Sequence, residues 1–254
     1  MQYGPAWTFS LLVGVVVAGG TIEACGILGR LGTRPVMPLC VAFALAIAAA
    51  FDSGLPFDLP VSLPLTLGIV TIVAAAMRRR DDARGMLDTI QASLLPPLLV
   101  GLMLAHLIGL RGLGDEIGRD LLFLLFLCVM LGDTAAYYVG SAIGRSKMTP
   151  VLSPNKSWEG AIAAIFASVA ASWLATVWFF PDLPLKHALI IGALLGPAGI
   201  LGDLAESTLK RAGGVKDSGR LLPGHGGLLD RIDSLLFAAP VLYYYCMAFL
   251  GAAP

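Results

Sequence analysis

Acidic side chains beside two apolar segments are the residues of this chain best suited to chemistry. Asp203, Glu206 and Ser207 follow a long apolar stretch at spacings of three and four residues, so a helix would carry them on one face. Asp230 and Asp233 stand three residues apart at the start of the last apolar segment, and a helix would align them in the same way. Carboxylate and hydroxyl oxygens are the ligands that hard cations prefer, so both groups are candidate metal ligands. The plainer alternatives are a solvated helix end for the first group and a pair that merely suits the helix dipole for the second.

The connection between these two groups is rich in glycine and in basic side chains. Its glycines are Gly213, Gly214, Gly219, Gly224, Gly226 and Gly227, and its basic residues are Lys210, Arg211, Lys216, Arg220, His225 and Arg231. Glycine backbone amides with lysines and arginines form a phosphate cradle, and adjacent carboxylates hold Mg²⁺ against the phosphate. The enrichment of cytoplasmic loops in basic residues explains where these cations lie, but not why they alternate with aspartates. The connection therefore predicts a phosphorylated, nucleotide-containing substrate.

Three further charged positions stand out. Asp133 lies well inside an apolar segment, with the oxygens of Thr134 and Tyr137 nearby. A charge at such depth is costly, and it marks either a functional site or a stabilising pair with a neighbouring helix. Lys156 has two possible roles: its side chain binds a phosphate, or it is simply part of the turn that begins the next helix. Glu23, in the first apolar segment, is assigned no role.

The composition places these residues in a membrane protein. Of the 254 residues, 57% are hydrophobic and 13% are charged, and the mean hydropathy is +0.82. Soluble domains carry about 25% charged residues, and their apolar residues occur in shorter runs. The net charge of zero gives no indication of nucleic-acid binding. We therefore expect an all-α, polytopic integral membrane protein with about eight transmembrane helices.

Long apolar blocks give the expected positions of these helices. They cover residues 5–29, 36–51, 59–77, 86–109, 120–143, 158–180, 187–206 and 232–252. We divide them into N-terminal helices, 1–119, and a catalytic C-terminal half, 120–254, within one membrane-embedded unit. A face of small residues in the fifth block indicates close helix packing and permits a homodimer. Its members are Gly132, Ala136, Gly140 and Gly144.

The distribution of basic residues orients the spans. Most of the 17 lysines and arginines fall in the connections after the first, third, fifth and seventh blocks. Cytoplasmic loops are enriched in such residues. We therefore expect both termini outside the cytoplasm, and a site that faces the cytoplasm from the inner membrane of the cell.

The segment from Ser207 to Asp233, STLKRAGGVKDSGRLLPGHGGLLDRID, resembles the signature of the phosphatidate cytidylyltransferases, also called CDP-diglyceride synthetases. That signature has the form S-x-apolar-K-R, four residues, K-D-x-small, two residues, apolar-P-x-H-G-G-apolar-x-D-R-apolar-D, and every specified position is met. GDLAES at 202–207, SPNKSWEG at 153–160 and GDTAAYYVG at 132–140 are also similar to the bacterial members. The resemblance covers about the C-terminal half, whereas the N-terminal half is similar only as apolar spans.

The resemblance implies a Mg²⁺-dependent reaction that joins CTP to phosphatidic acid and releases pyrophosphate, giving CDP-diacylglycerol for phospholipid synthesis. It implies that Asp203 and Asp230 hold the divalent ion, that Asp233 and Asp133 complete the set, and that a second cation such as K⁺ is accommodated. Lys216 is expected to serve catalysis together with Asp203, Asp230 and Asp233. The other expected substrate-binding residues are Lys156, Ser207, Lys210, Arg211, His225, Gly226, Gly227 and Arg231.

Three other functions remain open. One is a related cytidylyltransferase that acts on an archaeal ether-lipid phosphate. A CDP-alcohol phosphotransferase also handles CDP-lipids, but the D-G-x₂-A-R motif of that family is missing from this sequence. An ion or solute transporter would explain Asp133 and the small-residue face, but not the glycine-rich basic connection.

Overall fold

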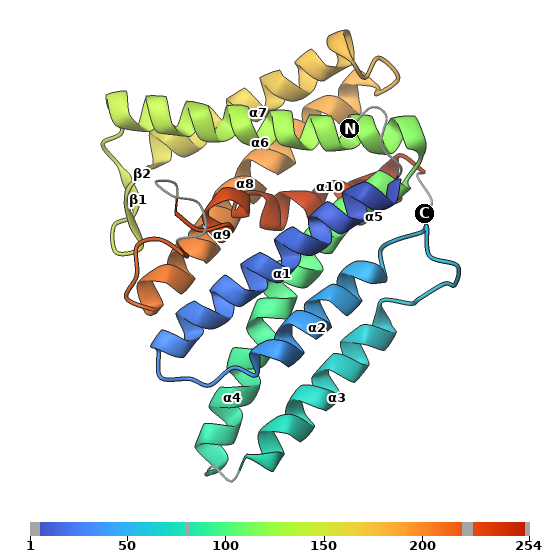
Figure 1. Ribbon diagram of the computed structural model, residues 1–254. Coiled ribbons are helices and arrows are strands. Elements are labelled where there is room, and N and C mark those ends of the chain that lie inside the picture. The colour runs from blue at the N-terminus through green and yellow to red at the C-terminus, as the bar shows by residue number, and fades with distance from the viewer. Residues whose placement is uncertain (1–5, 80–81, 220–225, 252–254) are drawn as a thin grey trace. The chain divides into compact units, whose positions relative to one another are not determined.

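Helices account for almost all of the described structure. The computed structural model describes residues 6–79, 82–219 and 226–251 (Figure 1). Within these ranges, six helices are long and apolar enough to cross a membrane, and two shorter apolar helices accompany them. The prediction of a polytopic, all-α membrane protein is therefore confirmed, and six candidate spans with two shorter apolar helices agree approximately with the predicted number of about eight.

The chain forms two compact units, each built from two stretches of sequence. The first unit comprises Met1–Gly112 and Leu209–Ile232, and the second comprises Leu113–Thr208 and Asp233–Pro254. The signature segment from Ser207 to Asp233 therefore contributes residues to both units.

The first unit is a bundle of apolar helices in which α1, α2 and α3 lie side by side (Figure 1). Its elements are α1 (Ala6–Arg30), α2 (Met37–Ala49), α3 (Ser62–Arg78), α4 (Ala83–Pro96), the π-helix η1 (Pro97–Leu102), α5 (Met103–Gly112) and α9 (Leu229–Ile232). At 1.5 Å per residue, α1 extends about 37 Å, which exceeds the hydrocarbon core of about 30 Å. By the same measure α2 extends only about 20 Å, so it is too short to cross that core as a helix.

A π-helical segment interrupts the fourth predicted span. Pro96 and Pro97 are adjacent, and neither has the N–H group that an α-helix would hydrogen-bond at this point. From Pro97 to Leu102 the backbone takes the wider π form, and α5 then resumes the α-helical form. The three elements still form one apolar span, Ala83–Gly112.

The second unit is built on two long helices, α6 and α7, which run side by side (Figure 1). Its elements are α6 (Asp115–Ile143), β1 (Lys147–Thr149), β2 (Ser153–Ser157), α7 (Trp158–Trp178), α8 (Leu185–Ala212) up to Thr208, and α10 (Leu235–Phe249). A side chain at Gly132 of α6 would lie only 2.9 Å from the hydroxyl oxygen of Ser168. One at Gly160 of α7 would lie 2.8 Å from the carbonyl oxygen of Ala136. The predicted close packing is confirmed, and it involves α7 of the same chain; a homodimer stays a prediction.

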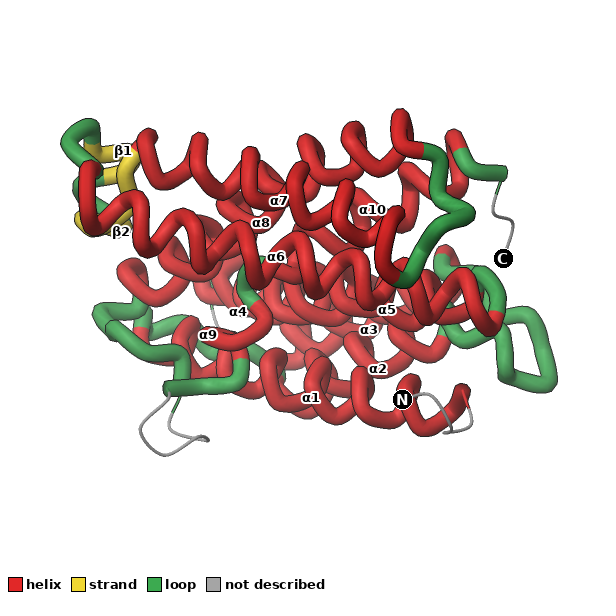
Figure 2. The backbone as a smooth tube through the Cα atoms, turned by 90° about the horizontal axis from the view of Figure 1, so that it is seen from above, coloured by secondary structure: helices red, strands yellow, loops and turns green. Residues whose placement is uncertain are grey.

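A short antiparallel hairpin, β1–β2, joins α6 to α7 (Figure 2) and has no counterpart among the predicted elements. Ser157 pairs with Lys147 across the hairpin. Its hydroxyl oxygen also caps α7 by accepting a 3.2 Å hydrogen bond from the N–H of Gly160. A side chain at Gly144 would overlap this same hydroxyl group. Lys156 is therefore attached to a residue that is fixed by the hairpin, by α7 and by α6.

The last predicted span is interrupted near its start. α9 ends at Ile232, Asp233 and Ser234 form a turn, and α10 begins at Leu235. The N–H of Ser234 donates a 2.7 Å hydrogen bond to Oδ1 of Asp233. Such a local bond from backbone to side chain competes with helix continuation. Asp233 therefore lies in a turn between two helices, although Leu229–Phe249 still forms one apolar span.

Candidate functional site

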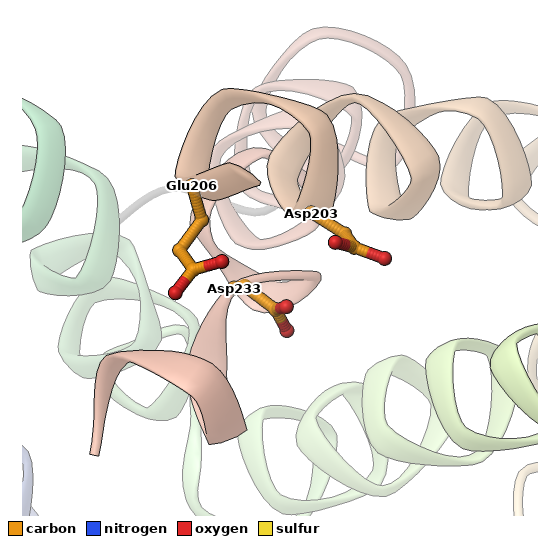
Figure 3. A group of neighbouring side chains, drawn as sticks. All are labelled: Asp203, Glu206 and Asp233. Atoms are coloured by element: carbon orange, nitrogen blue, oxygen red, sulfur yellow. The ribbon is translucent and has the colours of Figure 1, made fainter. Parts of the chain in front are cut away.

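Three carboxylates of the second unit face one another (Figure 3). Asp203, Glu206 and Asp233 each contribute an oxygen atom, and these oxygens all lie within 4.8 Å of one another. Asp203 and Glu206 extend from successive turns of α8, and Asp233 belongs to the turn before α10. Glu206 is fully buried, whereas the two aspartates are partly exposed. We call these three residues the carboxylate cluster.

The donor set of the carboxylate cluster fits a hard divalent cation. Oxygens on opposite sides of Mg²⁺ lie about 4.2 Å apart, and those around Ca²⁺ lie up to about 5 Å apart. At most one pair of the three oxygens can lie on opposite sides of an ion, so the separations in the cluster, up to 4.8 Å, would shorten around a bound cation. Oxygen-only ligands of this charge are also the type that these cations prefer. The residues present are suited to the cation that the resemblance implies.

Further predicted residues surround Asp203 within the second unit. The Nζ atom of Lys156 lies 2.6 Å from Oδ2 of Asp203, and the hydroxyl of Ser207 donates a 3.3 Å hydrogen bond to Oδ1. Asp133 lies within electrostatic range of both Asp203 and Lys156. The structure thus brings together five of the predicted site residues in this unit: Asp133, Lys156, Asp203, Ser207 and Asp233.

Asp230 lies in the first unit and has a different environment. Its Oδ1 atom accepts a 2.6 Å hydrogen bond from Lys210. Its Oδ2 atom accepts hydrogen bonds from the N–H groups of Ser218, at 2.9 Å, and Gly227, at 2.8 Å. Ser218 and Gly227 belong to the described parts of the glycine-rich connection, 213–219 and 226–229, which we call the glycine loop. Asp230 organises the glycine loop, and its role as a metal ligand stays a prediction.

Lys216 borders a cavity beside the glycine loop. The cavity has a volume of about 630 Å³, and Glu23, Arg30, Asp217 and Ser218 also line it. Small-molecule sites commonly occupy about 300–1,000 Å³. Two basic side chains on its wall suit the phosphates of a nucleotide. The position of Lys216 is therefore compatible with its predicted contact to substrate.

The other predicted substrate-binding residues are distributed over the first unit. Arg211 donates a 3.4 Å hydrogen bond to a backbone carbonyl oxygen of the glycine loop, and Arg231 is exposed on α9. Gly226 has φ +81°, a conformation that favours glycine. Gly227 donates its N–H to Asp230, as described above. His225 lies outside the described residues.

Two of these carboxylates, Glu206 and Glu23, were not among the site residues that the resemblance implied, although Glu206 was a candidate metal ligand from its spacing. The spacing of Glu206 from Asp203 did indicate a shared helical face, but only the structure joins Glu206 to Asp233. Glu23 contacts the glycine loop through hydrogen bonds considered below. The signal that could have identified Glu23 is its isolation, because a lone charge inside an apolar span is by default a functional candidate.

The described residues thus combine a carboxylate cluster suited to a divalent cation with a basic, glycine-rich loop suited to phosphate groups. The sequence matches the cytidylyltransferase family over residues 1–249, and the chain belongs to this family. The resemblance inferred from the signature is thereby confirmed. Family membership also disfavours the CDP-alcohol phosphotransferase and transporter alternatives.

Named relatives make the match more specific. The phosphatidate cytidylyltransferase of Bacillus subtilis (strain 168) is 41% identical over 156 residues, which are 61% of this chain and 57% of that protein. The phosphatidate cytidylyltransferase of Staphylococcus aureus (strain COL) is 45% identical over 127 residues, 49% of this chain and 48% of that one. The uncharacterized protein YnbB of Escherichia coli (strain K12) is 41% identical over 167 residues, 65% and 56% of the two chains. The chain thus spans about half the length of the curated relatives it matches.

Proposed function

We propose that this protein transfers a cytidylyl group from CTP to phosphatidic acid, giving CDP-diacylglycerol and pyrophosphate for phospholipid synthesis. The observation that carries the proposal is the carboxylate cluster. Asp203 and Glu206 lie just before the signature segment, and Asp233 is its last residue. Membership in the cytidylyltransferase family and similarity to two bacterial phosphatidate cytidylyltransferases support the same reaction. CTP and phosphatidic acid are then the two substrates.

The proposed reaction is an in-line displacement at phosphorus. A phosphate oxygen of phosphatidic acid forms a bond to the α-phosphorus of CTP, and the bond from that phosphorus to the pyrophosphate oxygen breaks. Phosphatidic acid supplies the nucleophile, so no covalent intermediate on the protein is needed. Positioning and charge neutralisation are the main contributions of a protein to transfers of this type.

The protein's own side chains divide these tasks. Asp203, Glu206 and Asp233 would hold Mg²⁺, with Asp230 and Asp133 as further predicted ligands. The bound ion would neutralise charge on the reacting phosphates, and a second cation such as K⁺ would be compatible with several carboxylates. The residues proposed to bind the phosphates are Lys156, Ser207, Lys210, Arg211, Lys216, His225, Gly226, Gly227 and Arg231.

We further propose that the protein lies in the inner membrane of the cell with this chemistry on the cytoplasmic side. Most of its basic residues fall in every second connection between the apolar blocks, and cytoplasmic connections are enriched in such residues. CTP is a soluble nucleotide and phosphatidic acid is a lipid, so the two substrates would meet at this membrane surface. Reporter fusions that end at Val215 should show a cytoplasmic location. A reporter on the outer face would contradict the orientation.

The function is tested with membranes that contain the protein, incubated with labelled CTP, phosphatidic acid and Mg²⁺. We expect label in a CDP-lipid and an equal release of pyrophosphate. Membranes with the folded protein that form no CDP-lipid would contradict the proposal. Competition between phosphatidic acid and an archaeal ether-lipid phosphate separates the two possible lipid substrates.

A further inference from the structure

Glu23 connects α1 to both ends of the glycine loop within the first unit. Its Oε1 atom accepts a 2.9 Å hydrogen bond from the N–H of Leu228, and Oε2 accepts one of 2.8 Å from the N–H of Leu229. The hydroxyl of Ser218 lies 3.0 Å from Oε2. One carboxylate on a membrane helix therefore binds the loop both before and after residues 220–225.

The glycines of the loop leave room for this carboxylate. A side chain at Gly219 would overlap the carboxylate of Glu23. One at Gly227 would first meet the hydroxyl oxygen of Ser218 and the backbone nitrogen of Gly219, and would also come within 2.6 Å of Oε2 of Glu23. Glu23 thus gives Gly219 a steric reason for lacking a side chain, and it adds to the close packing at Gly227.

Glu23 also acts together with Asp230. The hydroxyl of Ser218 lies 2.9 Å from Oδ2 of Asp230 and 3.0 Å from Oε2 of Glu23, so it stands between the two carboxylates. Backbone N–H groups of the loop donate to each of them. Hydrogen bonds to an ionised acceptor are about twice as strong as neutral ones, so this arrangement fixes the loop backbone.

The loop surface fixed in this way is the wall of the cavity that contains Lys216. Glu23 itself lines that cavity, together with Arg30, Asp217 and Ser218. Lys216 stands two residues before Ser218, whose backbone and hydroxyl groups both take part in the anchoring. A change at Glu23 is therefore transmitted to Lys216 through the backbone of the loop.

We propose that Glu23 is a positioning residue for CTP: it anchors the glycine loop so that Lys216 and the loop amides are held in place for the nucleotide phosphates. This inference rests on the proposed cytidylyl transfer. Glu23 does not contact the reacting atoms in this role; it acts through the loop.

The decisive variant is Glu23→Gln, which keeps the shape of the side chain. An amide NH₂ replaces one carboxylate oxygen, so a donor faces the N–H group of either Leu228 or Leu229 and one of these two hydrogen bonds is lost. We expect the KM for CTP to rise on the order of tenfold or more, which corresponds to losing one charge-assisted hydrogen bond. The KM for phosphatidic acid should stay near its wild-type value. Tryptic cleavage after Lys216, followed by mass spectrometry, should be faster than in the wild-type protein.

Two further variants complete the test. Glu23→Asp keeps the charge and should restore most of the affinity for CTP. Asp88→Asn makes the same carboxylate-to-amide exchange at an exposed position of α4 in the same unit, and both CTP kinetics and trypsin cleavage should be unchanged. If Glu23→Gln does not fold in detergent, Glu23→Asp is used in its place. We then expect a smaller rise in the KM for CTP and an unchanged KM for phosphatidic acid.

The outcomes separate this inference from the proposed function. An active wild-type enzyme with an unchanged KM for CTP in the folded Glu23 variants would overturn the role of Glu23 and leave the reaction intact. An equal rise in both KM values would indicate a merely structural role, and would also overturn it. A wild-type protein that forms no CDP-lipid would instead contradict the proposed function, while the trypsin comparison would still report on the anchoring.

Discussion

The carboxylate cluster and the surroundings of Asp230 are both acidic, but they differ in what lies around the oxygen atoms. In the cluster, oxygens of three carboxylates lie within 4.8 Å of one another. At Asp230, an ammonium group and two backbone N–H groups lie within 2.9 Å of one carboxylate. Lys156 pairs with Asp203, but three neighbouring carboxylates still repel one another unless a further cation lies between them, whereas Asp230 has donors of the protein on both of its oxygens. The cluster is therefore suited to holding an ion, and Asp230 holds the glycine loop.

Among the variants that test this difference between the two regions, Asp203→Asn should cause the largest loss of activity. It removes charge from the carboxylate cluster and from the ion pair with Lys156. We expect CDP-diacylglycerol synthesis to fall about a thousandfold or more, because a bound cation contributes several kcal/mol to charge stabilisation. The rate is measured over a range of Mg²⁺ concentrations. Asp182→Asn, at an exposed position of the same unit, is the control and should retain full activity.

Asp230→Asn tests whether the two regions share the metal chemistry. We expect turnover to fall about a hundredfold or more, with a raised Mg²⁺ requirement, because the family resemblance implies that Asp230 is a metal ligand in addition to its contacts with the glycine loop. The variant should remain folded in detergent. A raised KM for CTP with an unchanged Mg²⁺ requirement would assign Asp230 to the loop alone. Near-normal synthesis would remove it from both roles.

Glu206→Gln is a smaller change within the carboxylate cluster. The amide has the same shape, so the fully buried site should tolerate it. We expect the Mg²⁺ concentration for half-maximal rate to rise about ten- to a hundredfold, as when a residue that supports a metal site is lost. Unaltered Mg²⁺ dependence in the folded variant would show that the ion does not use Glu206.

Lys216→Ala should give the smallest of these effects. The side chain borders the cavity and is exposed, so the loss of one phosphate contact should raise the KM for CTP about tenfold. The Mg²⁺ requirement should not change, in contrast to Glu206→Gln. If the KM for CTP also stays the same, Lys216 does not bind the nucleotide.

The spans could be predicted from the sequence because each is a long apolar block. α1 and α7 lie within about two residues of the predicted ranges at both ends, whereas α6 begins about five residues earlier and α8 ends about six residues later than predicted. The π form after Pro96, the hairpin before α7 and the turn at Asp233 were missed. All three depend on local hydrogen bonds that the apolar pattern does not contain.

The candidate site, too, could be predicted from the sequence only in part. The spacing of Asp203 and Glu206 places both on one face, because a helix fixes the relation between residues three apart. This spacing cannot identify Asp233 as the third residue of the carboxylate cluster, because the position of Asp233 depends on where α9 ends. Glu23 was given no role for the same reason, since its partners lie about 200 positions away in the sequence.

Ser157 has a practical consequence for engineering this protein. Its hydroxyl caps α7 and fills the space beside Gly144, so residue 157 is a poor place for a substitution. Val151, at the tip of the same hairpin, is 88% exposed. Exposed tips tolerate inserted peptides well. An epitope placed after Val151 would therefore make the hairpin accessible to antibodies on one side of a sealed vesicle, with the cap of α7 left intact.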